Sequence, residues 1–322
     1  MKRIGVLTSG GDAPGMNAAV RSVVRTAIYY DKEVFGINRG YAGMIDGDMK
    51  MLKKSDVANI IHRGGTILRT ARSEEFRTKE GRAKAQKNLD KHGIEGLVVI
   101  GGNGSYTGAM KLSQEYGVRI LGIPGTIDND IYGTDYSIGF DTAINTAVEA
   151  VDKIRDTADS HSRLFIIEVM GRHSGYIALH TGIGSGSSAI FLPEKQDSLE
   201  EFVKNLENSG RRHKLFNLVI VAEGYSGGDI HEIASRIKKN NKIDVRTAVI
   251  GHLQRGGSPS AMDRVLASQL AYNAVKGLID GKTNVATGLI DKKIVFTPIK
   301  DAISLRKAPD ESMIKMAEIL AL

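Results

Sequence analysis

The sequence predicts an α/β protein built on mainly parallel sheets, and three observations lead to that fold class. Short apolar runs such as residues 96–100 lack the alternation of a half-exposed strand, which is typical of strands buried on both faces. Stretches with apolar residues at helical spacing separate these runs, so strands and helices alternate along the chain. The length of 322 residues is sufficient for two domains, each with its own core.

The first half of the chain contains a regular series of such elements. The predicted strands are residues 4–7, 33–38, 96–100 and 119–123, and the predicted helices are residues 17–30, 78–92 and 105–116. Gly93 and Gly117 end the last two helices, because glycine readily adopts the conformation found just beyond a helix C-terminus. Open α/β sheets bind ligands at the carboxyl ends of their strands, so the loops after these strands are the candidate binding sites.

The second half continues the alternation. Apolar residues at helical spacing begin at Ile144 and continue to Ile154, which predicts a helix there. The predicted strands that follow are residues 164–169, 189–192, 216–222 and 245–250. The polar loop at residues 125–140 is expected to carry the chain from one domain to the other.

Composition narrows the classes of function. The chain contains no cysteine, which excludes disulfides, thiolate metal sites and a cysteine nucleophile and suits a reducing, cytoplasmic location. The net charge of +7 comes from scattered residues, and with no Trp and 6% aromatic residues a nucleic-acid partner is not expected. The absence of a run of about 18 apolar residues predicts no membrane span. The eight histidines lack metal-ligand spacing, so a structural zinc is not indicated.

Two glycine-rich loops are candidate phosphate-binding sites. Residues 9–17 and 101–106 each join a predicted strand to a helix, where backbone N–H groups and the helix dipole attract anions. The first has the outer glycine spacing of a Walker A loop, but Met16 and Asn17 replace its lysine and hydroxyl residue. One such loop is often only a tight connection. Two loops after neighbouring strands make phosphate binding the favoured interpretation.

A third loop, residues 124–130, carries Asp128 and Asp130. Residues two apart on an extended backbone face the same side, so both carboxylates are expected to point at one site. Two adjacent carboxylates can divide the roles of general base and metal ligand. A polar turn with solvated side chains is the alternative interpretation.

Several arginines are expected in loops at strand ends, beside glycines. Guanidinium groups stay charged and bind phosphate oxygens bidentately, whereas a single arginine of this kind usually forms a surface salt bridge. Glu223 ends an apolar strand and is a candidate acceptor for sugar hydroxyls, with an ordinary ion pair as its alternative role. The arginines in question are Arg72, Arg163, Arg172, Arg246 and Arg255.

Motifs along almost the whole chain resemble those of the bacterial ATP-dependent 6-phosphofructokinases. They are, in the family's order, LTSGGDAPGMNAA, RGGT, PGTIDND, GFDTA, DKIRDTA, MGRH, VAEG and GHLQRGGSP. The resemblance implies two doubly wound lobes with mainly parallel sheets and an active-site cleft between them, in a homotetramer with shared active sites. It further implies an ATP-binding lobe at residues 1–139 plus 252–305 and a sugar-phosphate-binding lobe at residues 140–251 plus 306–322.

The resemblance also implies roles for individual residues. ATP would bind Gly11, Arg72, Ser73, Gly102, Asn103, Gly104 and Ser105. Fructose 6-phosphate would bind Thr126, Asp128, Arg163, Met170, Gly171, Arg172, Glu223, Arg246, His252 and Arg255, with Arg163 and Arg246 reaching it from a neighbouring subunit. The catalytic set would be Gly11, Arg72, Thr126, Arg172 and Asp128 as base, with Mg²⁺ held at Asn103 and Asp130. An effector site for a nucleoside diphosphate or phosphoenolpyruvate would use Arg21, Arg25, Arg155, Gly186, Ser188, Arg212 and Lys214.

The sequence departs from the family pattern in three places. Asn103 stands where an aspartate that helps to hold magnesium is usual, and a neutral oxygen attracts a hard dication less than a carboxylate does. Ser188 replaces a common glutamate of the effector site, and Ser73-Glu74 replaces a residue followed by proline beside Arg72.

Two other functions compete with ATP-dependent phosphoryl transfer. A pyrophosphate-dependent phosphofructokinase usually carries bulky residues where this chain has Gly104 and Gly125, so both glycines favour ATP. A weakened, regulatory relative that binds nucleotide and sugar phosphate would be compatible with Asn103. The intact aspartate at Asp128 argues against that second alternative.

Overall fold

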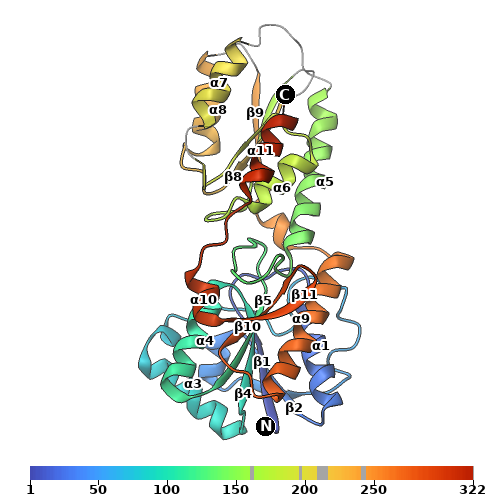
Figure 1. Cartoon of the computed structure of the whole chain (residues 1–322), viewed down its shortest axis with the longest axis vertical. Helices are drawn as coiled ribbons and strands as arrows, with labels where there is room; N and C mark the ends of the chain where they lie inside the picture. Colours follow the sequence, from blue (N-terminus) through green and yellow to red (C-terminus); the bar gives the residue numbers. More distant parts are fainter. Residues whose placement is uncertain (160–162, 196–197, 209–216, 241–243, 322) are drawn as a thin grey trace. The chain divides into compact units, whose positions relative to one another are not determined.

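The computed structural model describes residues 1–159, 163–195, 198–208, 217–240 and 244–321, and the chain divides into two compact units (Figure 1). Unit 1 comprises Met1–Thr142 and Arg255–Lys307, and unit 2 comprises Ala143–Gln254 and Ala308–Leu322. None of the described helices is long and apolar enough to cross a membrane.

Unit 1 is built on a seven-stranded sheet with the order β11-β10-β5-β4-β1-β2-β3. The five central strands are parallel, and only the two edge strands, β3 and β11, run antiparallel to their neighbours. The strands are β1 (Arg3–Thr8), β2 (Glu33–Ile37), β3 (Met49–Leu52), β4 (Gly96–Gly101), β5 (Arg119–Pro124), β10 (Val285–Ile290) and β11 (Lys293–Pro298).

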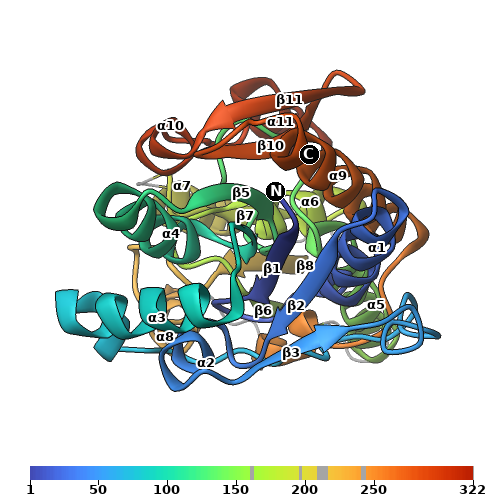
Figure 2. The same ribbon diagram turned by 90° about the horizontal axis from the view of Figure 1, so that it is seen from below.

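Helices cover both faces of this sheet, as Figure 2 shows. Helices α1 (Met16–Tyr29) and α9 (Ala261–Ile279) pack against each other on one face. On the other face α2 (Gly40–Asp46), α3 (Lys79–His92), α4 (Asn103–Tyr116) and α10 (Ile299–Ser304) share one apolar core with the strands. A short 3₁₀ turn, η1 (Glu75–Arg77), precedes α3.

Unit 2 has a smaller, fully parallel sheet with the order β7-β8-β6-β9. Its strands are β6 (Leu164–Val169), β7 (Ala189–Phe191), β8 (Asn217–Ala222) and β9 (Val245–Val249). Its remaining elements are α5 (Phe140–Asp159), which begins in unit 1, α6 (Tyr176–Gly184), α7 (Ser198–Asn208), α8 (Ile230–Asn240), η2 (Gly251–Arg255), whose last residue belongs to unit 1, and α11 (Glu311–Leu320). The α7 and α8 side chains form an apolar core with the strands.

The structure confirms the predicted α/β fold with mainly parallel sheets. Each predicted strand ends within one residue of the observed one, except that residue 216 lies outside the described part of the chain. The prediction for residues 125–140 was wrong, because this whole loop belongs to unit 1. The chain passes into unit 2 after Thr142, inside α5, since the apolar face of that helix is continuous across the boundary. It returns after Gln254 and leaves again after Lys307.

Candidate active site

Unit 1 contains a cavity of about 540 Å³ at the carboxyl ends of three adjacent strands. The loop after β1 contributes Ser9 to Gly11, and the loop after β4 contributes Gly102 and the start of α4. The loop after β5 contributes Thr126, Asp128 and Asp130. The three loops selected from the sequence therefore line one cavity, as expected where parallel strands end at a common edge.

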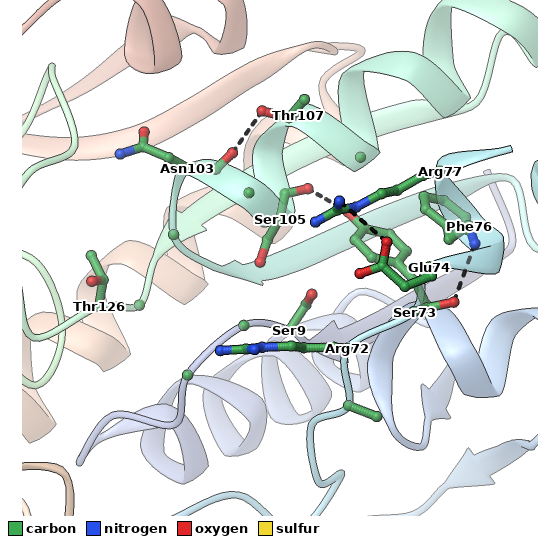
Figure 3. A pocket seen from close by; sticks show the side chains of 18 of the residues that line it. Ser9, Arg72, Ser73, Glu74, Phe76, Arg77, Asn103, Ser105, Thr107 and Thr126 are labelled. Carbon is green, nitrogen blue, oxygen red and sulfur yellow. Dashed lines mark hydrogen bonds and ion pairs between the residues drawn. The ribbon is translucent and has the colours of Figure 1, made fainter. Parts of the chain in front are cut away.

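The amino end of α4 forms one wall of the cavity (Figure 3). Gly102 precedes the helix, and no described side chain caps its first N–H groups. These groups and the helix dipole form a site for an anion. The hydroxyl of Ser105 is buried and has no hydrogen-bond partner among the described residues, so it is available to a ligand. A Cβ at Gly101 would lie only 2.4 Å from that hydroxyl oxygen, which requires glycine there.

The aspartate loop differs from its prediction in backbone conformation. Asp128 lies in a turn rather than on extended backbone, because Asn129 adopts a left-handed φ of 52°. Asn129 is buried, accepts a hydrogen bond from the Ser137 amide at 2.9 Å and donates to the Asp135 carbonyl at 3.0 Å. Both Asp128 and Asp130 nevertheless line the cavity, as predicted.

Asn103 and Asp130 meet across the cavity. The Asn103 Nδ2 donates to Asp130 Oδ2 at 2.8 Å, while Asn103 Oδ1 is buried without a hydrogen-bond partner among the described residues. This leaves a carboxylate and an unused amide oxygen side by side. Magnesium is usually bound by one or two carboxylates together with substrate phosphates and water, so these residues fit a magnesium ion.

Three more predicted residues line the cavity: Arg72 and Ser73, assigned to ATP, and Arg255, assigned to the sugar phosphate. The Arg255 Nη1 donates to the Asp12 carbonyl at 3.2 Å, and a Cβ at Gly11 would lie 2.5 Å from the same nitrogen. Glycine at position 11 therefore lets the Arg255 guanidinium rest against the loop, and Arg255 belongs to unit 1.

Several residues that line the cavity were not predicted from the sequence. Tyr41 and Phe76 stack with ring centroids 4.0 Å apart, and both line the cavity. Arg77 pairs with Glu74 at 3.2 Å on the same wall. Helical periodicity could have indicated Thr107, Gly108 and Lys111, because they follow Gly104 on one face of α4. No local pattern points to Tyr41, which reaches the site only through the fold.

Five of the ten predicted sugar-phosphate residues lie, in unit 2, at the carboxyl edge of the second sheet, whereas Thr126, Asp128 and Arg255 belong to unit 1. Met170, Gly171 and Arg172 follow β6, Glu223 follows β8, and His252 follows β9. The Gly224 amide donates to the Gly171 carbonyl at 3.1 Å, which joins the first two loops. Gly171 has a φ of 135°, and Arg172, Glu223 and His252 are exposed there.

The sequence analysis expected Arg163 and Arg246 in loops after strands, and this prediction was wrong. Arg163 immediately precedes β6 and Arg246 is the second residue of β9, so both lie at the amino edge of that sheet. Arg163 stands just before the apolar run of β6, and only Val245 of β9 precedes Arg246. Asp244 binds both side chains, with Oδ2 2.7 Å from Arg163 Nε and 3.2 Å from Arg246 Nη2. Although desolvation opposes the shift, the two guanidinium groups lower the pKa of Asp244.

The predicted effector residues are distributed over both units. Arg21 and Arg25 lie on α1, where burial and the charge of Arg25 lower the pKa of Arg21. In unit 2 the Arg155 Nε and Nη2 atoms are buried without hydrogen-bond partners among the described residues. Gly186 and Ser188 lie between α6 and β7, with Gly186 at a φ of 59°. Arg212 and Lys214 lie outside the described residues.

Comparison with known proteins shows which family this chain resembles. The profile of the family described as phosphofructokinase matches residues 3–278. The chain is 54% identical over its full length to the full-length ATP-dependent 6-phosphofructokinase 1 of Thermus thermophilus, and 52% identical to the full-length ATP-dependent 6-phosphofructokinase of Bacillus subtilis.

Solved structures give the same result. The Saccharomyces cerevisiae phosphofructokinase structure matches all of this chain with a TM-score of 0.91 and 36% identity, although the chain spans only 48% of that protein's length. A pyrophosphate-dependent phosphofructokinase from Marinobacter aquaeolei shares the fold, with a TM-score of 0.84, 24% identity, and coverage of 96% of this chain and 86% of the other. On these matches and on the cavity that holds its motifs, the chain belongs to the phosphofructokinase family.

Proposed function

We propose that this protein transfers the γ-phosphoryl group of ATP to the 1-hydroxyl of fructose 6-phosphate, giving fructose 1,6-bisphosphate and ADP. One observation carries the proposal: Asp128 lines the same cavity as the uncapped amino end of α4, so a base and an anion site face one space. The relatives named ATP-dependent 6-phosphofructokinase, more than half identical over their whole length, support the same reaction.

In the proposed mechanism, different residues of the cavity bind the phosphates, orient the transferred group and accept the proton. Phosphoryl transfer passes through a loose transition state, so the protein mainly positions the reactants and balances charge. The α4 amino end, Gly11 and Arg72 bind the phosphates, and Thr126 orients the transferred group. Asp128 accepts the hydroxyl proton as the new oxygen–phosphorus bond forms and the bond to the ADP oxygen breaks. Asp130 and the free Asn103 oxygen would hold magnesium, which supplies positive charge to the phosphates.

The proposal extends to the second unit and to assembly. Unit 2 binds the sugar phosphate through the loops that carry Arg172, Glu223 and His252, while unit 1 binds ATP. Arg163 and Arg246, at the opposite edge of the unit 2 sheet, serve a neighbouring subunit of a homotetramer. The predicted effector residues bind a nucleoside diphosphate or phosphoenolpyruvate, and the enzyme works in the cytoplasm.

Two features favour ATP over pyrophosphate as the donor. A Cβ at Gly104 would have no heavy atom within 4 Å, so the cavity wall is open at this position. Tyr41, Phe76 and Lys111 line the same cavity, and a stacked aromatic pair together with a cation suits a nucleoside. Gly125 also lines the cavity, but a Cβ there would meet the buried Ile100 side chain at 3.0 Å, so packing explains this glycine and it does not distinguish the two donors.

The decisive experiment is a coupled assay of fructose 1,6-bisphosphate formation with ATP or pyrophosphate at several free magnesium concentrations. We expect turnover with ATP and magnesium and little with pyrophosphate. Turnover with pyrophosphate alone would identify the other donor class. Binding of ATP and fructose 6-phosphate without turnover at any magnesium concentration would identify a regulatory relative instead.

We expect Asn103→Asp to lower the free magnesium needed for half-maximal activity several-fold. A carboxylate at this position would face Asp130, 2.8 Å away in the present hydrogen bond, and two carboxylates bind a dication more strongly than a carboxylate and an amide. Without magnesium the two carboxylates would repel, so the Tm of the variant should fall relative to the parent and recover when magnesium is added. Because the Asn103-Gly104 sequence can deamidate, fresh protein should be checked by mass spectrometry. Identical magnesium curves would show that Asn103 takes no part in the metal site.

We expect Arg163→Ala and Arg246→Ala each to raise the KM for fructose 6-phosphate by about tenfold to a hundredfold, the usual range for loss of a charge-assisted hydrogen bond. Their effect on kcat should be smaller. Arg236→Ala is the matched control, since Arg236 is an exposed arginine of unit 2 that pairs with Glu200. A loss confined to the KM for ATP would assign both arginines to a different site.

A further inference from the structure

Lys307 is a partly buried lysine that contacts the aspartate loop from a distant part of the sequence. Its Nζ donates to Asn129 Oδ1 at 2.9 Å and to the Asp135 carbonyl at 2.8 Å. Burial lowers the pKa of Lys307 to about 8, against the opposing effect of the nearby Asp135 and Asp130 charges. An amine held in such a position loses much of its hydration, which only specific acceptors can offset.

The acceptor that it binds lies between the two aspartates of the site. Asn129 follows Asp128 and precedes Asp130, and its left-handed backbone turns the chain so that both neighbours line the cavity. Its Oδ1 accepts hydrogen bonds from the Ser137 amide and from Lys307, and its Nδ2 donates to Asp135. The side chain is therefore fixed on both its oxygen and its nitrogen, with Lys307 as the contact from outside the loop.

The loop closes on itself at the same place. The Ser137 hydroxyl donates to the Thr126 carbonyl at 2.6 Å, which joins the two ends of the segment that carries Asp128. Lys307 then binds two points inside this closed segment, Asn129 and Asp135. An unfavourable backbone conformation persists only where the surroundings hold it, and these contacts supply that support.

We propose that Lys307 is a positioning residue for phosphoryl transfer: through Asn129 and Asp135 it holds the turn that aims Asp128 at the substrate hydroxyl. Lys307 does not line the cavity itself, so in this proposal it acts through the loop and not on the substrate. The proposal depends on the proposed role of Asp128 as base. A base displaced by about 1 Å can lose about two orders of magnitude in rate, so loss of the contact should appear in kcat.

The test compares Lys307→Met and Lys307→Arg in the full-length protein. We expect Lys307→Met to lower kcat about tenfold to a hundredfold while the KM for ATP stays within about threefold, because α4 and Arg72 are untouched. Lys307→Arg keeps a charged donor and should restore most of the lost kcat. If Lys307→Met fails to fold, Lys307→Gln, which retains one donor group, replaces it with the same expected direction.

A matched control separates positioning from general destabilisation. Asn88 also donates from one side chain to two acceptors of unit 1, the carbonyls of Met44 at 3.1 Å and Ile45 at 2.7 Å, but it does not line the cavity. Asn88→Leu should lower the Tm with kcat unchanged. An equal loss of kcat in Asn88→Leu at an equal loss of Tm would overturn the proposal.

A double-mutant cycle tests the route through Asn129. Asn129→Gly removes the side chain but tolerates the left-handed backbone, so it should lower kcat without forcing a new turn. If Lys307 acts through this residue, adding Lys307→Met to Asn129→Gly should cost much less than it costs in the parent. Fully additive losses, or a Lys307→Met variant with kcat within about threefold of an active parent, would overturn the inference. A parent without phosphoryl transfer would refute the proposed function itself.

Discussion

Asp128→Asn is expected to lower kcat by about 10²–10⁴-fold, the usual contribution of a general base. The amide cannot accept the proton of the sugar hydroxyl, while its size leaves the turn at Asn129 and the cavity wall in place. The KM for ATP and the binding of fructose 6-phosphate should therefore change little. Steady-state kinetics together with calorimetric binding of both ligands measures the two effects separately.

Asp130→Asn is the matched control for that variant, because it makes the same chemical change two residues away on the same cavity wall. The loss of kcat in Asp130→Asn should be recovered in part at high magnesium concentration, because Asp130 is proposed to bind the metal. The Asp128→Asn loss should be insensitive to magnesium. If both variants respond to magnesium in the same way, or if Asp128→Asn retains turnover within a few-fold of the parent, Asp128 is not the base.

The parts of the fold that the sequence predicts well are those with a strong local pattern. Strands β1, β4 and β5 are buried almost throughout, so each appears as an uninterrupted apolar run. Their order in the sheet brings the three following loops to one edge, which is why loops chosen only by their glycines and aspartates line a single cavity. The helix ends at Gly93 and Gly117 follow from backbone conformation, with φ values of 60° and 71°.

Some elements at the edges of the fold were not predicted. The edge strands β3 and β11 consist mostly of exposed or half-buried residues. β3 is only four residues long, and the apolar run of β11 is limited to Ile294, Val295 and Phe296. The helix α11 contributes no fully buried residue. Arg163 and Arg246 were assigned to loops after strands, although the predicted strands 164–169 and 245–250 already place Arg163 before the first and Arg246 near the start of the second.

Contacts between residues far apart in the sequence also could not be predicted. Tyr41 and Phe76 are far apart in the sequence, with strand β3 and irregular structure between them, and only the shared core of unit 1 stacks them beside the cavity. Lys307 is farther still from the aspartate loop that it contacts, at a sequence separation of 178 from Asn129. Such pairs follow from tertiary packing, and no single-sequence pattern encodes them.

Substitution of Arg72 is the second change expected to lower kcat strongly. Negative charge develops on the transferred phosphoryl group, and few cations line the cavity. The side chain extends into the cavity from the segment before η1 (Figure 3). Arg77 lies on the same wall but pairs with Glu74, and both of these side chains are about three-quarters exposed. The two arginines thus share a cavity and a charge and differ in their surroundings.

Arg72→Ala is expected to lower kcat by about 10²–10³-fold, the usual cost of removing one group aimed at a developing negative charge. Arg77→Ala should mainly raise the KM for ATP by a few-fold, because Glu74 already holds its guanidinium and exposed ion pairs contribute little. Arg72→Lys separates charge from geometry: a lysine restores the charge but not the bidentate contact, so its kcat should fall between those of the parent and Arg72→Ala. Measuring kcat and the KM for ATP in all three variants decides the assignment. Equal losses of kcat in Arg72→Ala and Arg77→Ala would contradict the assignment. They would mean that the cations of the cavity stabilise the transition state together and that Arg72 has no special role.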